Sequence, residues 1–284
     1  MIEAKPSRTA MGVAIRRAAH QLFDTPLVLD DPFALPIVGS DAADKLREAE
    51  GDQQDAMARA MRAFIVVRSR FAEDELARAM ARGTHQYVVL GAGLDTFALR
   101  NPHAPGALRI FEVDHPATQE WKRQKLSAAN IATPPTLTFA AVDFERETLA
   151  DGLAHAGFDR SAPAFFSWLG VTMYLTDEAI TQTFGYVASM GSGGGIIFDY
   201  AIPEASLGWI ERMALKALTK RVAAVGEPFR TSFDPAALHQ RLTAAGFHGI
   251  TDLGATELNE RYFTDSSDGL AVRGTVGRIL SAEI

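Results

Sequence analysis

From residue 86 to about residue 200, short apolar runs alternate with helical segments, and this alternation constrains the fold more than any other feature of the sequence. Short apolar runs bounded by turn residues predict buried strands. Strands that alternate with helices predict a doubly wound α/β sheet whose strands are mostly parallel. The expected strands are 86–90, 108–113, 137–142, 164–169 and 196–200, and the expected helices between them are 116–129, 145–156 and 177–190.

The end of the chain has a different order of elements. A helix is expected at 234–245, and strands follow near 247–253 and 271–280. Two strands in succession predict an antiparallel hairpin at the edge of the sheet, which brings the expected sheet to seven strands.

Two further regions are expected to be helical. Residues 1–82 predict an N-terminal helical cap on a Rossmann-like domain that spans 83–284. The segment 203–230, inserted within that domain, is too long for a tight connection. It is interpreted as a lid over the ligand crevice or as an extra packing helix. The apolar side expected for this segment consists of Leu207, Ile210, Met213 and Leu218.

The composition excludes several classes of protein. A net charge of −7 argues against duplex nucleic acid or an anionic membrane as partner, because phosphate contacts need a basic surface. The chain has no cysteine, which excludes disulfides, thiolate metal sites and cysteine nucleophiles. It also lacks HExxH, HxH and GxSxG motifs, so neither a metal site nor a serine hydrolase is expected. With no apolar leader and no membrane-spanning run, the expected location is the cytoplasm.

The strongest motif, Gly91-Ala92-Gly93-Leu94-Asp95-Thr96, directly follows the first expected strand. A buried strand that runs into Gly-x-Gly brings the backbone close to a ligand, with helix N-terminal amides facing it. Thr96 stands where a dinucleotide-binding motif has its third glycine. We therefore expect a nucleoside ligand without a pyrophosphate, and a simple tight turn is the alternative.

Carboxylates stand at the ends of the next two expected strands. Glu112 and Asp114 share one face of their strand, and Asp114, nearer the carboxyl end, is predicted to bind ribose hydroxyls. The alternative role for Asp114 is a helix cap before Pro116. Asp143 is predicted to accept a hydrogen bond from the amino group of adenine, and the amide of Phe144 is predicted to meet the ring nitrogen. Alternatively, Asp143 caps the helix expected from residue 145.

An arginine interrupts an apolar stripe in the long helix expected at 52–80. The stripe consists of Met57, Met61, Phe64, Arg68 and Phe71. An unpaired buried charge is very costly, so Arg68 needs a ligand carboxylate or a protein carboxylate as partner. After the fourth expected strand, Gly170 permits close approach of a ligand, and Tyr174 is expected to point over the crevice.

Together these motifs resemble the leucine carboxyl methyltransferase-like family of S-adenosylmethionine-dependent O-methyltransferases, and in particular its bacterial branch. The matching stretches are RTAMGVAIRRAAH, VVRSRF, VVLGAGLDTFALR, FEVDHP, AAVDF and WLGVTMYL, spread from about residue 8 to residue 175. The resemblance implies a Rossmann-like class I methyltransferase fold. It also implies S-adenosyl-L-methionine as cofactor and S-adenosyl-L-homocysteine as its product.

The resemblance further implies which residues bind the cofactor. Arg68 matches the arginine that holds the methionine carboxylate, and Arg16 or Arg17 matches a basic position with a similar role, of which Arg16 is predicted. The predicted cofactor ligands are Arg16, Arg68, Gly91, Ala92, Gly93, Asp95, Asp114, Asp143, Phe144 and Gly170. Leu169 stands where the family's eukaryotic branch has a glutamate. This removes one expected cofactor contact and argues against a protein C-terminal leucine as substrate.

The predicted reaction is methyl transfer to a carboxylate of a small, partly apolar molecule. Such an acid is already ionised at neutral pH, so no general base is required. Methylation of a hydroxyl would require one, with His115 or His248 as candidates. An NAD(P)-linked reductase, or a non-catalytic binding module on the same fold, is a competing hypothesis. The candidates for positioning the substrate are Tyr174, Tyr200, Arg230 and His115.

Overall fold

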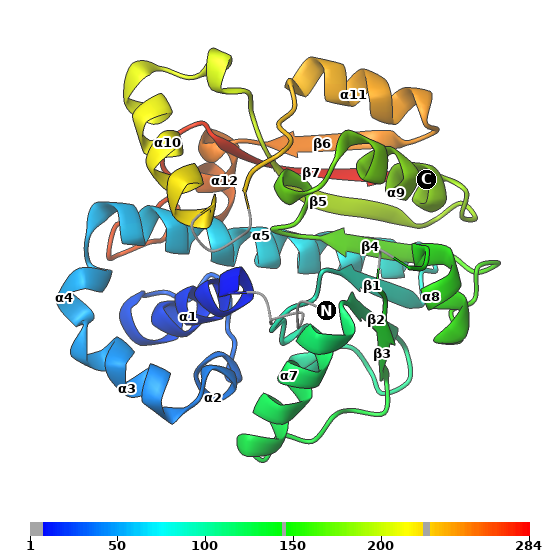
Figure 1. Cartoon of the computed structure of the whole chain (residues 1–284), viewed down its shortest axis with the longest axis horizontal. Helices are drawn as coiled ribbons and strands as arrows, with labels where there is room; N and C mark the ends of the chain where they lie inside the picture. The colour runs from blue at the N-terminus through cyan, green and yellow to red at the C-terminus, as the bar shows by residue number, and fades with distance from the viewer. Residues whose placement is uncertain (1–7, 144–145, 224–227) are drawn as a thin grey trace.

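The computed structural model describes residues 8–143, 146–223 and 228–284. Its centre is a seven-stranded sheet with the order β3-β2-β1-β4-β5-β7-β6 (Figure 1). The strands are β1 (Gln86–Leu90), β2 (Arg109–Asp114), β3 (Leu137–Ala141), β4 (Ala164–Trp168), β5 (Gly195–Ala201), β6 (His248–Leu253) and β7 (Gly277–Glu283). Strands β1 to β5 are parallel, and β7 is antiparallel to both β5 and β6. The predicted mostly parallel sheet with an antiparallel pair at one side is confirmed.

The antiparallel pair differs in detail from the expected hairpin. A helix, α12 (Ala255–Tyr262), lies between β6 and β7, so no tight turn joins them. Strand β7 lies inside the sheet, next to β5, and β6 lies at the edge. The sequence of α12 is mostly polar and only Leu258 is fully buried, so its apolar pattern is weak.

Helices cover both faces of the sheet and its carboxyl-terminal edge. The N-terminal region contains α1 (Arg8–Phe23), α2 (Ala34–Val38), α3 (Ser40–Glu48), α4 (Glu50–Gln53) and α5 (Ala56–Ala81). The remaining helices are α6 (Phe97–Arg100), α7 (Pro116–Ala128), α8 (Leu149–His155), α9 (Asp177–Ala188), α10 (Trp209–Ala223) and α11 (Pro235–Ala244), with short 3-10 helices η1 (Thr172–Tyr174) and η2 (Glu204–Ser206). In Figure 1, α1 and α10 lie at the left, beyond the carboxyl ends of the parallel strands.

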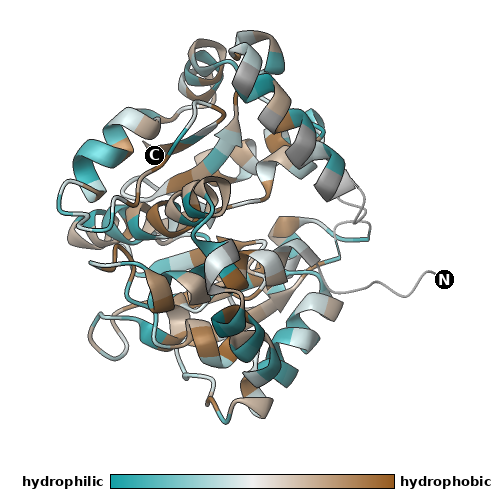
Figure 2. Ribbon diagram, turned by 90° about the vertical axis from the view of Figure 1, so that its left-hand side faces the viewer, coloured by the Kyte–Doolittle hydropathy of each residue, from teal (hydrophilic) through white to brown (hydrophobic). Residues whose placement is uncertain are grey.

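The sheet separates two apolar cores because alternate side chains of each strand point to opposite faces. In β1, Val88 and Leu90 pack on one face, and Tyr87 and Val89 pack on the face covered by α5. Every residue of β1, β4 and β5 is buried. Strands that are covered on both faces read as largely apolar runs. The helices around the sheet are mixed, and Figure 2 shows brown apolar and teal hydrophilic segments within single helices.

The predictions of apolar, buried faces for α5 and α10 are wrong in part, because some of the predicted residues are exposed. In α5, Phe71 is buried as predicted, but Met57 is 50% exposed because Asp55 caps the helix at an exposed turn. Leu207, before α10, is buried as predicted, but Met213 is 56% exposed, and Leu215 is buried although it was not predicted. The side chains of Ile210 and Leu218 lie outside those the structure describes. No helix among residues 8–143, 146–223 and 228–284 is long and apolar enough to cross a membrane.

Candidate active site

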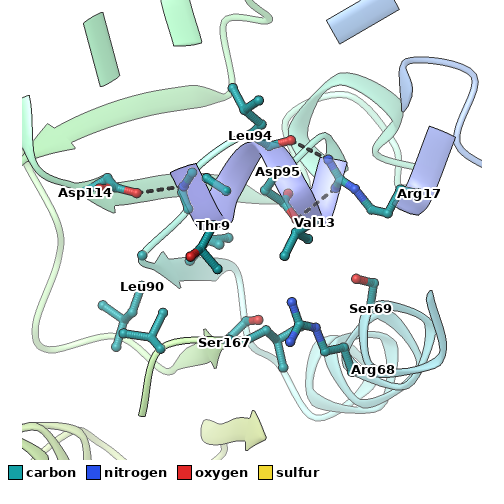
Figure 3. A pocket seen from close by; sticks show the side chains of 18 of the residues that line it. Thr9, Val13, Arg17, Arg68, Ser69, Leu90, Leu94, Asp95, Asp114 and Ser167 are labelled. Carbon is teal, nitrogen blue, oxygen red and sulfur yellow. Dashed lines mark hydrogen bonds and ion pairs between the residues drawn. The ribbon is translucent and has the colours of Figure 1, made fainter. Parts of the chain in front are cut away.

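A cavity of about 310 Å³ opens at the carboxyl ends of β1, β2 and β4 (Figure 3). Strand β1 lies between β2 and β4, and the strand order reverses at β1. Ligands of doubly wound sheets bind at such a switch point, beyond the carboxyl ends of the strands. Helix α1 and the middle of α5 provide the other walls. The described lining residues are Thr9, Ala10, Val13, Arg17, Arg68, Ser69, residues 89–95, Asp114, Ser167, residues 169–171 and Tyr174.

The glycine-rich loop after β1 forms the floor of the cavity. Gly91 (φ +68°) and Gly93 (φ +50°) have left-handed backbone conformations that favour glycine. A Cβ atom on Gly91 would lie 2.5 Å from Val171, and one on Gly93 would lie 2.9 Å from Ala10. The amides of Gly91 and Ala92 donate to the carbonyl of Val113. These glycines therefore bring the loop against its neighbours, and the first two amides of the motif are bound to β2 rather than turned to a ligand.

Thr96 has a structural role at the position of the missing third glycine. It is fully buried, and its hydroxyl donates to Asp31 at 2.6 Å and accepts from Arg17 at 3.3 Å. The side chain thus joins the glycine-rich loop to the N-terminal helices. The helix that follows, α6, has only four residues.

Asp114 lines the cavity, whereas Glu112 does not. The two oxygens of Asp114 accept from the amides of Gly93 (2.6 Å) and His115 (2.7 Å). Burial raises the pKa of Asp114, although these two backbone hydrogen bonds oppose the rise. Glu112 is buried in an ion pair with Lys122, and its burial raises its pKa to about 7. The alternative role of Asp114 as a cap is wrong, because the cap of α7 is His115, whose Nδ1 accepts from the amide of Ala117.

Two buried arginines reach the cavity, one from each covering helix. Arg68 is 7% exposed, and its Nη1 lies 2.8 Å from Asp199. Arg17 is 2% exposed, donates to the carbonyl of Leu94, and lies 3.7 Å from Asp95. The Nε atom of each arginine has no hydrogen-bond partner among the described residues. A buried donor without a partner is costly. Nε of Arg100, which pairs with Glu73 and is absent from the described cavity wall, is unpaired in the same way, so what marks Arg17 and Arg68 is that they line the cavity.

The basic residue of α1 that reaches the cavity is Arg17. Arg16 is absent from the described lining and donates along the helix to the carbonyl of Gly12. Adjacent residues on a helix point about 100° apart, so only packing decides which of them faces the sheet.

The loop after β4 closes the cavity against α5. Gly170 has φ +73°, and a Cβ atom there would lie 2.9 Å from Nη2 of Arg68. Leu169 and Tyr174 both line the cavity, and the Tyr174 ring packs 5.4 Å from that of Phe229. This glycine therefore allows the guanidinium to lie over the loop.

Other predicted residues lie outside this cavity. Asp143 follows β3 and pairs with Arg146 at 3.3 Å, and its alternative role as a cap is wrong because Thr148 caps α8. Phe144 lies outside the described residues. Tyr200 is buried and donates to Asp252 at 2.6 Å, a contact that serves the core.

Arg230 lines a second cavity of about 160 Å³ between the end of β5, η2, α10 and residues 229–232. Its amide donates to the carbonyl of Met173 beside Tyr174. Ring packing between Tyr174 and Phe229 connects the walls of the two cavities. Among the residues that the structure describes, no three His, Asp or Glu side chains are grouped as metal ligands would be.

Sequence reasoning missed Asp199, the protein partner of Arg68. Its signal is a single carboxylate within GIIFDYA, a run that otherwise has the pattern of a fully buried strand. The pair joins residues 131 positions apart, so only the fold reveals it.

Comparison with known proteins shows the family to which the chain belongs. Residues 10–188 match the family model described as leucine carboxyl methyltransferase. YktD of Bacillus subtilis (strain 168), provisionally named an S-adenosyl-L-methionine-dependent methyltransferase, is 30% identical over 97% of each chain. A relative from Mycobacterium marinum with a provisional name of the same class is 33% identical over 72% of this chain and 68% of its own.

Solved structures show the same fold at low identity. A structure from Thermobifida fusca YX, provisionally titled a methyltransferase, has a TM-score of 0.59 and 14% identity, and covers 99% of this chain and 96% of its own. A DUF574 family protein from Streptomyces avermitilis has a TM-score of 0.52 and 16% identity, with 94% and 96% covered. Fold, site and relatives define an S-adenosyl-L-methionine-dependent methyltransferase. The chain belongs to the leucine carboxyl methyltransferase family.

Proposed function

We propose that the larger cavity holds S-adenosyl-L-methionine, with its methionine carboxylate at Arg68 and Arg17 and its ribose at Asp114. Two buried arginines on the cavity wall suit a carboxylate, because the planar fork of arginine matches it. A carboxylate at the tip of the second strand suits ribose hydroxyls. The residue assignments for Gly91, Ala92, Gly93, Asp95 and Gly170 agree with their positions on the cavity wall.

We propose further that residues 1–82 act as a cap over the cofactor and residues 203–230 as a lid over the acceptor. Arg17 and Arg68 both come from the cap. The smaller cavity is bordered by α10 and has both apolar and polar walls, with Arg230 among them. Its described lining is Ala201, Ile202, Glu204, Leu215, Thr219, Phe229, Arg230, Thr231 and Ser232. A small, partly apolar molecule with an acidic group fits such a space.

The acceptor is proposed to be a carboxylate, and the composition of the cavity wall carries this inference. The described linings of the two cavities include neither histidine nor lysine, and Glu204, the carboxylate of the smaller one, pairs with Lys216 at 3.2 Å. Asp114 is already bound by two amides, and Asp95 accepts from the amide of Phe97. His115 caps α7 through the nitrogen that would act as a base. A carboxylate needs no base, whereas a hydroxyl acceptor does.

When bound, the cofactor supplies a methyl group on a positively charged sulfur that is an intrinsically good electrophile. The protein then has to orient the acceptor and exclude water. Tyr174 lies between the two cavities, in a position to align the acceptor, and Arg230 is placed to attract its charge.

The test is transfer of tritiated methyl groups from S-adenosyl-L-methionine to a panel of short aliphatic acids, aromatic acids and matched phenols. Methyl esters release volatile methanol in mild alkali, and methyl ethers do not. We expect alkali-labile label on one class of acids, reduced at least about tenfold in Arg230→Ala. Arg160→Ala, which removes an exposed arginine before the amino end of β4, is the matched control. Label that is stable to alkali would contradict the proposal, because it would show that the acceptor is a hydroxyl and not a carboxylate.

A further inference from the structure

Strand β5 carries a carboxylate in the middle of a wholly buried run. Asp199 is 0% exposed, and all seven residues of β5 are buried. An isolated carboxylate at such a position would be very costly. Its Oδ2 instead lies 2.8 Å from Nη1 of Arg68, and its Oδ1 accepts from the amide of Gly170. One side chain therefore joins β5, α5 and the loop after β4.

These contacts restrict the guanidinium of Arg68 from two sides. Asp199 engages Nη1, and the backbone of Gly170 lies so close to Nη2 that a Cβ atom would be 2.9 Å away. A guanidinium is planar, so fixing one nitrogen and one face fixes the direction of its remaining donors. Arg68 lines the cavity, so these remaining donors are the ones a ligand there would meet.

A pair that served stability alone would be an inefficient solution, since an apolar pair of similar volume is often as stable as a buried ion pair. The surroundings of Asp199 are apolar on its own and the neighbouring strand, where Ile197 and Ile279 contribute to the same core. The pair differs from the buried Arg62–Asp24 pair of the same helix in that its arginine lines the cavity.

We propose that Asp199 is a positioning residue, which orients Arg68 toward the carboxylate of the cofactor's amino-acid moiety. This inference rests on the proposed placement of the cofactor in the larger cavity. Asp199 itself is absent from the described lining of that cavity, so it acts through Arg68 and through the amide of Gly170.

Two ligands that differ in the amino-acid moiety separate positioning from general stability. S-Adenosyl-L-homocysteine carries the carboxylate, and 5′-methylthioadenosine lacks the whole amino-acid end. Both are titrated calorimetrically into wild type, Asp199→Asn and Arg68→Ala. Asparagine keeps the size of the side chain and an acceptor for Gly170, but loses the charge that holds Arg68. The matched control is Asp252→Asn, which alters another carboxylate with a buried side chain, paired with Arg278 away from the cavity.

We expect Asp199→Asn to weaken binding of S-adenosyl-L-homocysteine by about tenfold or more, and that of 5′-methylthioadenosine by less than about twofold. Asp252→Asn should leave the ratio of the two affinities unchanged. Gly170→Ala, which pushes a methyl group into the guanidinium, should reproduce the selective loss by an independent route. The ratio concerns only folded protein, so partial unfolding of a variant does not disguise the result.

Each other outcome overturns the proposal. Unchanged or tighter binding of S-adenosyl-L-homocysteine by Asp199→Asn, or equal weakening of both ligands, would show that Asp199 does not orient Arg68. If Arg68→Ala is selective and Asp199→Asn is not, only the positioning role fails. If Arg68→Ala also fails to discriminate between the ligands, the placement of the cofactor fails with it.

Discussion

Arg62 and Arg68 lie on the same helix, α5, and both are buried, yet their surroundings differ. Arg62 donates through Nε and Nη2 to Asp24, at 2.6 and 2.7 Å, and through Nη1 to the carbonyl of Gln53 at 2.9 Å. Arg68 has Asp199 on Nη1, and its Nε lacks a partner among the described residues. Each nitrogen of the Arg62 guanidinium has a protein partner, whereas Arg68 lines the cavity.

The surroundings of Arg62 form a closed network. His20 donates from Nδ1 to Asp24 at 2.8 Å and accepts at Nε2 from the amide of Val28. Burial raises the pKa of Asp24, but hydrogen bonds from His20 and Arg62 outweigh it and leave the pKa lowered. This network joins α1, α5 and the turn between α1 and α2. Position on the cavity wall, rather than burial or charge, distinguishes the arginine proposed to bind a ligand from the structural arginine.

Loss of Arg62 should have the largest effect. Arg62→Ala leaves Asp24 buried without its guanidinium, so stability should fall by about 3–5 kcal/mol. Urea denaturation measures the loss. Arg70→Ala is the control because Arg70 pairs with Asp74 on the exposed side of the same helix, where a pair contributes less than about 1 kcal/mol. Equal stability of the two variants would contradict the structural role given to Arg62.

The pH dependence of ligand binding should test the other part of the comparison, which is the proposal that the cavity beside Arg68 holds the cofactor. Burial raises the pKa of Asp114, so ionised Asp114 becomes scarce at a higher pH than an exposed aspartate would. Affinity for S-adenosyl-L-homocysteine should be full above that raised pKa and should fall as the pH drops through it. Asp114→Asn should bind about tenfold more weakly at neutral pH and lack this dependence.

Titrations between about pH 4 and pH 8 check this expectation. Asp151→Asn provides the control, because Asp151 is an exposed member of the capping box of α8. Identical pH profiles for wild type and Asp114→Asn would show that Asp114 does not bind the ligand in its ionised form.

Substitution of His115 should have the smallest effect. His115→Ala removes the cap of α7 and should lower stability by about 1 kcal/mol, and His115→Asn should restore most of it because asparagine is a good cap. Methyl transfer should be unchanged in both variants. A loss of turnover in both, with stability intact in His115→Asn, would instead indicate a general base and a hydroxyl acceptor.

The parallel strands were predictable to within one residue because they read as short apolar runs. Strands β1, β4 and β5 are buried on both faces, which makes them largely apolar. Helix α8 was predicted from residue 145 but begins at Leu149, where Thr148 and Asp151 form a capping box. Helix α12 was missed since only Leu258 of it is buried.

The site was predictable where the strands end. Asp114 and the glycine-rich loop follow directly from strand positions, and the cavity contains them. The choice between Arg16 and Arg17 was not predictable, because it depends on how α1 packs on the sheet. The partner of Arg68 was not predictable either, since the contact with Asp199 exists only once β5 lies beside α5.

The most direct test of the comparison is calorimetric titration of S-adenosyl-L-homocysteine into wild type, Arg68→Ala and Arg70→Ala. Removal of Arg68 opens Asp199 to the cavity, so water can replace the lost partner and the variant should stay folded. We predict micromolar binding to wild type and to Arg70→Ala, and at least about tenfold weaker binding to Arg68→Ala. Equal affinity of all three proteins would contradict the account, because the incompletely bonded arginine would then have no ligand to hold.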